Sequence, residues 1–529
     1  MSKRALTVAL VLGLVWPLSA GPSALDPEIT EKIRHQESTA SELMRTLHFL
    51  TDVYGPRLTG SPNARQAAEW ARKTMTAWGL SNAHLETWDF GHQGWTNERV
   101  TAFVVSPVKD QLVVEVLAWT PGTNGVVTAP AFQLLVPDRP TDAELSAYLD
   151  SIRSQVKGRI ILAGKTATVP VNLTPGAARR DEERLRQRYA PDARPPAAPV
   201  RSEEQKQATG PKPLTRVEIS QRIDEFLIAN GVPVRINDAG RELGQIVAFH
   251  NATFDPSKVV STLVMRNEDY GRLSRILADG TQVDLEINIV NQFHPDGRTA
   301  YNVVAEIEGT DKKAEVVILG GHLDSWQAAT GATDNAVGCA TVMEAARILK
   351  VIGVRPRRTI RVALWTGEEQ GLLGSQAYVK EHFGSFESPK PDYFLLSAYL
   401  NIDNGTGRTR GASVFGPATA AAVIREALAP LVDLGLVGAA ATSRRALGST
   451  DSASFNAAGL PGINFEQDPI QYESATHHTN LDTFERIIEE DVKTSAIAIA
   501  ATAYHLAMRD ELLPRFDKTT MPALAGSSR

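Results

Sequence analysis

Residues 316–326 have the sequence VVILGGHLDSW, an apolar run that leads directly into a histidine and, two positions later, an acid. A short run that is apolar throughout predicts a strand buried on both faces. Similar segments lie at residues 284–290, 302–308, 359–365, 393–402 and 462–465. Helical segments separate them, at residues 335–351, 374–383, 417–431 and 451–458. This alternation predicts an α/β fold, with a mixed, mostly parallel sheet flanked by helices on both faces.

The chain before residue 276 has a different sequence pattern. Short apolar runs separated by Gly and Pro predict a smaller β-rich domain over residues 111–275. Within it, a dense charge run and several prolines predict an exposed, flexible excursion at residues 170–213. We therefore expect the N-terminal part of the main domain at 21–110, the inserted domain at 111–275, the rest of the main domain at 276–510 and a tail at 511–529.

The composition excludes some kinds of partner and some kinds of stabilising cross-link. The 529 residues include 55 Lys and Arg and 61 Asp and Glu, for a formal net charge of -6. Because positive and negative residues are nearly equal in number, the sequence does not predict a basic surface, and no nucleic acid partner is expected. The only cysteine, Cys339, excludes an intramolecular disulfide and a cysteine-based zinc finger.

The first 20 residues predict a secretory signal peptide. Lys3 and Arg4 precede an apolar run over residues 5–18, which small residues follow. The run is shorter than the ~20 residues that span a bilayer, and an uncleaved membrane anchor is the alternative. We expect a secreted or periplasmic protein that has no stable membrane span after signal cleavage.

Polar side chains follow the predicted strands at five places along the chain. They are His322 with Asp324, Asp334, the pair Glu368 and Glu369, Asp403, and the doublet His477 and His478. Each place also has an ordinary explanation, such as a helix cap at Asp334 or a solvated loop at the glutamates. Ligands of open α/β sheets bind beyond the carboxyl ends of the strands, so all five together indicate one site.

The types of residue at this edge suit a metal. Imidazole and carboxylate groups without any thiolate are typical of catalytic zinc. Asp334, Glu369 and Asp403 supply three negative charges, while His322 and His478 add none when neutral. Two Zn²⁺ ions and one bridging hydroxide would balance these charges.

The order of these motifs resembles the co-catalytic di-zinc exopeptidases, and within them the carboxypeptidase Q (plasma glutamate carboxypeptidase) group with its bacterial relatives. The motifs are GHLDS at 321–325, DN at 334–335, EEQGLLGS at 368–375, Asp403 and the HTxxDT pattern at 478–483. Further marks are PRLTGS at 56–61, GSTD at 448–451 followed by Phe455, and GLPG at 459–462. The inserted region looks, more loosely, like a protease-associated domain.

The resemblance implies a role for each residue. Asp334 would bridge two Zn²⁺ ions, with His322 and Asp403 at one and Glu369 and His478 at the other. Glu368 would be the general base. Asp324 would orient the ring of its histidine, a role for which Asp482 is a further candidate. His477 would be a loop residue, and the resemblance also suggests a homodimer.

These inferences predict a secreted exopeptidase that hydrolyses dipeptides or short peptides with metal-activated water. A broad di-zinc aminopeptidase is the main alternative, because metal motifs do not set which end of a peptide is recognised. A glutaminyl-cyclase-like acyltransferase would need one zinc, and a metal-free binding protein none. The complete set of five ligand positions argues against both.

Overall fold

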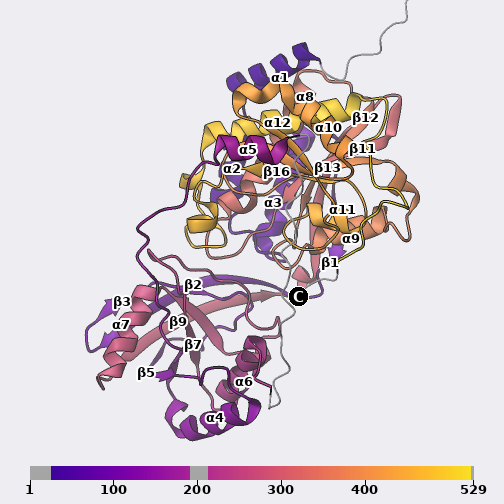
Figure 1. Cartoon of the computed structure of the whole chain (residues 1–529). Helices are drawn as coiled ribbons and strands as arrows, with labels where there is room; N and C mark the ends of the chain where they lie inside the picture. The colour runs from indigo at the N-terminus through magenta and orange to yellow at the C-terminus, as the bar shows by residue number, and fades with distance from the viewer. Residues whose placement is uncertain (1–25, 191–211, 526–529) are drawn as a thin grey trace, which may run out of the picture.

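The computed structural model describes residues 26–190 and 212–525, which form two connected bodies, each built on an eight-stranded sheet (Figure 1). The predicted signal peptide lies outside the described residues. In the part of the chain that is described, no helix is long and apolar enough to cross a membrane.

The first sheet confirms the predicted fold class. Its strands are, in spatial order, β1 (Ser81–Asp89), β10 (Thr299–Ile307), β12 (Arg358–Trp365), β11 (Lys312–His322), β13 (Leu396–Ile402), β16 (Gly462–Gln467), β14 (Thr409–Phe415) and β15 (Gly438–Thr442). The four central strands, from β12 to β16, run parallel, and antiparallel pairs lie toward both edges. Central strands this apolar must be covered on both faces.

Helices cover the first sheet on both sides (Figure 1). One face packs against α1 (Pro27–Ala40), α2 (Leu43–His48), α3 (Pro62–Ala77), α8 (Val337–Val351), α10 (Ala418–Leu428) and α12 (Glu489–Met508). The other face packs against α9 (Leu373–His382) and α11 (Ser452–Ala457). Cys339 lies in α8, where burial raises the pKa of its thiol to about 12 and keeps it unreactive.

The second sheet forms the other body. Its strands are β3 (Asp110–Gln111), β2 (Gly94–Ser106), β9 (Asp284–His294), β5 (Val127–Leu134), β6 (Ile160–Ala163), β7 (Val234–Asp238), β8 (Ser261–Met265) and β4 (Val114–Val116). Its helices are α4 (Asp142–Val156), α6 (Arg216–Ala229) and α7 (Asn267–Ala278).

The predicted strand at 284–290 belongs to this second sheet and not to the first. It forms most of β9, which pairs antiparallel with β2 from Gly94 opposite His294 to Ser106 opposite Asp284. The sheet therefore extends beyond residues 111–275 on both sides. The apolar pattern of the strand is the same in either sheet, so only its pairing partner decides which one it joins.

The segment predicted as an excursion contains one described helix, α5 (Glu182–Tyr189), which lies against the first body (Figure 1). Its residue Tyr189 is buried and donates a hydrogen bond to Glu466 over 3.0 Å. Arg188 pairs with the same carboxylate at 2.5 Å. These contacts hold α5 against the first body.

Two backbone crossings join the sheets, and three glycines pack together there. The crossings are the segment between β1 and β2 and the η3 turn (Pro295–Arg298) between β9 and β10. A Cβ on Gly94 would lie 1.9 Å from the carbonyl oxygen of Gly60, and one on Gly297 would lie 2.3 Å from the same oxygen. Any side chain at these positions would push the crossings apart.

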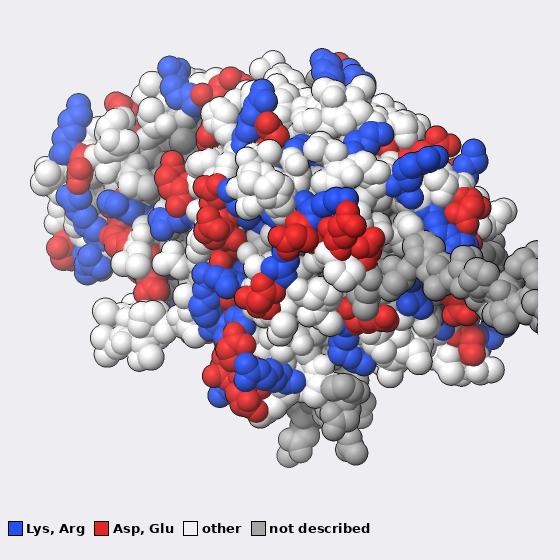
Figure 2. Space-filling view, turned by 90° about the horizontal axis from the view of Figure 1, so that it is seen from above, with Lys and Arg blue, Asp and Glu red and all other residues white. Residues whose placement is uncertain are grey.

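Charged side chains are mixed on the face seen from above. Figure 2 shows Lys and Arg interspersed with Asp and Glu over the described residues, without one continuous field of either sign.

We predict that Gly94→Ala lowers the free energy of unfolding by about 1–3 kcal/mol, because the new methyl group overpacks a backbone contact. Thermal and denaturant unfolding would measure the change. Gly176→Ala is the control, since nothing lies within 4 Å of the Cβ it would add. Equal stability of the two variants would show that the glycine contact does not hold the crossings together.

Candidate metal centre

The structure brings the five predicted ligands together at the carboxyl edge of the first sheet. His322 ends β11, Glu369 follows β12, and Asp403 follows β13. Asp334 lies in the η4 turn (Ala332–Ala336), directly before α8. His478 follows the η7 turn (Tyr472–Thr476), beyond β16.

Asp334 lies between two histidines. Its Oδ1 atom is 3.2 Å from Nε2 of His322, and its Oδ2 atom is 3.2 Å from Nε2 of His478. An acid stands beside each histidine, with Asp403 Oδ1 3.3 Å from the first and Glu369 Oε2 3.1 Å from the second. The cluster therefore consists of two pairs, each of one histidine and one acid, and the Asp334 carboxylate lies between the two pairs.

These residues fit a bound cation. His322, Asp334 and Glu369 have ligand atoms within 4.8 Å of one another. Both acids are almost fully buried, yet Oδ2 of Asp334 and Oε1 of Glu369 have no hydrogen-bond donor among the described residues. Buried acceptors without a donor are costly, and a metal ion would satisfy both.

The electrostatics also favour positive charge at this point. Burial opposes protonation of both histidines, but the neighbouring carboxylates outweigh it. The pKa of His478 rises to about 10 beside Asp334 and Glu369. The pKa of His322 is raised well above its usual value by Asp403 and Glu368. The acids thus supply the negative potential that holds a cation.

Glu368 lies next to the cluster, but its side chain is not among the candidate ligands, which form one group of His322, Asp334 and Glu369 and another of Asp334, His477 and His478. Burial, together with the nearby charges of Asp403 and Asp451, raises the pKa of Glu368 well above its usual value although His322 lowers it. A raised pKa suits a carboxylate that accepts and returns a proton.

Asp324 connects two parts of the site. Its backbone carbonyl accepts a hydrogen bond from Nδ1 of His322 over 3.0 Å, while the carboxylate is 3.6 Å from that atom. The carboxylate instead accepts the backbone N–H groups of Glu368 and Glu369, each over 3.3 Å. Asp324 therefore orients the ring chiefly through its backbone, and its side chain holds the loop of the two glutamates.

Asp482 holds the backbone before α8 and not a histidine ring. Its carboxylate accepts both the N–H and the hydroxyl of Thr333, over 2.6 and 2.7 Å, and the N–H of Asp334 over 3.1 Å. The prediction that Asp482 orients a ring is thus replaced by a role in placing the shared carboxylate.

Two residues of the PRLTGS motif support the site, although sequence reasoning assigned them no role. Arg57 is fully buried, and its guanidinium donates to the backbone carbonyls of Leu50, Leu323, Thr330 and Gly331. Thr59 accepts the N–H of Gly367 and donates to Asp324. The motif was the available signal, but all of these partners except Leu50 lie more than 260 residues away along the chain.

The second body also contacts the site. The backbone N–H of Ile246 donates to the side-chain oxygen of Asn480 over 2.9 Å, and the backbone N–H of Asn480 donates to the carbonyl of Ile246 over 3.0 Å. Phe249 follows in the same loop, and its ring centroid lies 5.1 Å from that of His478. His477, which was predicted to be a loop residue, lies beside His478, with Nε2 3.8 Å from Oδ2 of Asp334, and these three residues form a second group of candidate ligands.

The relatives of the chain support a zinc metallopeptidase. Residues 302–503 match the model of Peptidase family M28. Carboxypeptidase Q of Mus musculus is 27% identical over 502 residues, which cover 92% of this chain and 93% of the mouse protein.

Solved structures show the same fold. The peptidase M28 precursor from Shewanella amazonensis has a TM-score of 0.63 at 22% identity, over 93% of this chain and 99% of that one. The zinc aminopeptidase from Bacillus subtilis has a TM-score of 0.54 at 18% identity, over 90% and 97%.

We predict that Thr59→Val lowers the free energy of unfolding by about 1–3 kcal/mol, because it leaves a buried N–H and a carboxylate oxygen without their partner. The N–H belongs to Gly367 in the loop that carries Glu368, and the Asp324 carboxylate holds that loop, so kcat should also fall. Calorimetry and steady-state kinetics would measure the two effects.

Thr76→Val is the matched control, because the Thr76 hydroxyl bonds only its own helix at the surface. Unchanged kcat in the Thr59 variant would contradict a role for this hydroxyl in placing the loop.

Proposed function

We propose that the chain is an exopeptidase that hydrolyses dipeptides or short peptides with two zinc ions, as a carboxypeptidase Q-like enzyme. His322 and Asp403 would hold one ion, Glu369 and His478 the other, and Asp334 would serve both. The observation that carries the proposal is the central carboxylate, whose two oxygens each face a different histidine at 3.2 Å.

The residues around the metal positions suit peptide hydrolysis. When bound, the zinc ions would lower the pKa of a water molecule and polarise the scissile carbonyl. Glu368 would accept a proton from the attacking water and return it to the departing amine nitrogen. Asp324 would keep this carboxylate in place through the backbone N–H groups of the loop.

An aminopeptidase is the second candidate, and the likeness in fold to a zinc aminopeptidase supports it. The five ligand positions would be the same for either enzyme, so they do not separate the two. A single-zinc cyclase and a metal-free binding protein receive less support, because no ligand position is missing.

We also propose export through residues 1–20, on the strength of their sequence alone. In the proposed organisation, residues 111–275, together with β2 and β9, form the protease-associated-like domain. A homodimer rests on the resemblance to the exopeptidase family, and light scattering would test it.

A panel of peptides tests the proposed function. We expect free dipeptides to be hydrolysed faster than the same dipeptides with an acetylated N-terminus or an amidated C-terminus. Cleavage of C-amidated but not N-acetylated peptides would identify an aminopeptidase. No hydrolysis by the zinc-loaded protein would contradict both candidates.

We predict that Asp334→Ala removes both zinc ions, because one carboxylate serves both positions. Elemental analysis should find two ions per chain in the wild type and none in the variant. Asp138→Ala is the control, since Asp138 forms only an exposed pair with Lys165. A variant that retains both ions would refute the shared role.

We predict that Glu368→Gln loses catalytic rate, whereas Glu369→Gln loses zinc. The first removes a base but no ligand, so zinc should stay bound while kcat falls by about 10²–10⁴, the usual contribution of a positioned acid or base. The second should weaken one zinc position, and excess zinc should restore part of the activity. Zinc content and kcat of both variants distinguish the roles, and the opposite pattern would reverse the assignment.

A further inference from the structure

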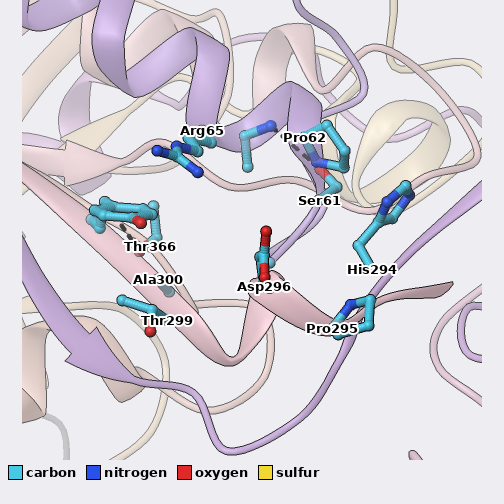
Figure 3. Close-up of a pocket in the computed structure, with 13 residues that line it drawn as sticks. Ser61, Pro62, Arg65, His294, Pro295, Asp296, Thr299, Ala300 and Thr366 are labelled. Carbon is cyan, nitrogen blue, oxygen red and sulfur yellow. Dashed lines mark hydrogen bonds between the residues drawn. The ribbon is translucent and has the colours of Figure 1, made fainter.

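A cavity of about 250 Å³ lies where the two sheets join, apart from the metal centre. Figure 3 shows it between the first turn of α3, the η3 turn and the start of β10. None of the five proposed metal ligands is among the residues that line it. The proposed metal chemistry therefore assigns no role to this cavity.

Two side chains of opposite charge reach into the cavity from different walls. Arg65 comes from α3 and Asp296 from the η3 turn, and in Figure 3 the Asp296 carboxylate points into the space between Arg65 and His294. Within the described residues, neither charged group has a hydrogen-bonded or ion-paired partner. Both charges are thus available to a ligand.

The orientation of Arg65 is set by an aromatic ring. Its guanidinium carbon lies 5.4 Å from the ring centroid of Tyr301, a cation–π contact that leaves the N–H groups free to donate. His294 is already engaged, with Nε2 2.9 Å from the hydroxyl of Thr96. The remaining walls include Pro62, Ala64 and Ala300, which offer apolar surface.

We propose that this cavity binds a free α-amino acid in its zwitterionic form. Arg65 would hold the α-carboxylate, Asp296 the α-ammonium group, and the apolar wall the side chain. A simple anion would meet the repulsion of Asp296, and a simple amine that of Arg65, so only a ligand with both charges satisfies both residues. The volume is too small for a folded partner but accommodates a molecule of this size.

The cavity is close to the catalytic loop. Thr366 lines it and lies two positions before Glu368, and its hydroxyl donates to the carbonyl of Tyr301 in the same wall. Free amino acids are what an exopeptidase releases, so a product of the proposed reaction has the chemistry that this cavity would recognise. Binding depends only on the residues of the cavity, so it is tested separately from the proposed peptide specificity.

Calorimetry on the zinc-loaded enzyme would test the proposal, with the metal centre blocked by a hydroxamate inhibitor. L-leucine is expected to bind with one site per chain. N-acetyl-L-leucine and L-leucinamide, which each lack one charge, should bind about 10-fold more weakly or worse, as the loss of a charge-assisted hydrogen bond predicts. Absence of L-leucine binding to the blocked enzyme would overturn the proposal.

Variants locate the site. Arg65→Gln and Asp296→Asn should each weaken L-leucine binding about 10-fold or more. Lys73→Gln, which removes a charge from the same helix outside this cavity, is the matched control and should change nothing. Binding that is within twofold of wild type in both cavity variants would place the amino acid elsewhere and refute the assignment. Equal melting temperatures would confirm that all three variants are folded.

Discussion

One buried carboxylate organises the site. Asp334 is 3% exposed and lies between two histidines, each of which has its own acidic neighbour. A negative charge so far from water needs positive charge on both sides. Burial would raise the pKa of Asp334, but the close pairing with His322 and His478 lowers it far below its usual range. The rest of the site serves to bring these partners to this point.

The ligands are held in place mainly through the backbone. Asp482 fixes the turn that carries Asp334, and the Asp324 side chain fixes the loop that carries both glutamates. Arg57 ties the end of β11 to the start of the Asp334 turn by donating to the carbonyls of Leu323 and Gly331. Such supporting contacts set ligand position to the accuracy that metal binding and proton transfer require.

The second body also places residues beside the site at the edge of the first sheet. Its loop at Ile246 and Phe249 touches the segment that carries His478, and the α5 helix contacts the first body at Glu466. The glycine contact at the two backbone crossings sets how these parts meet. Residues that shape the substrate pocket can therefore come from either body.

The sequence by itself determined the fold class, the strand ends and the five candidate ligands, because apolar runs and the polar residues that follow them are local patterns. It did not determine that residues 284–290 join the second sheet, or that β14, β15 and α12 complete the first body. Nor did it show that Asp324 holds a backbone loop or that Arg57 and Thr59 support the site. Each of these depends on partners far along the chain, and only the tertiary structure decides which distant groups meet.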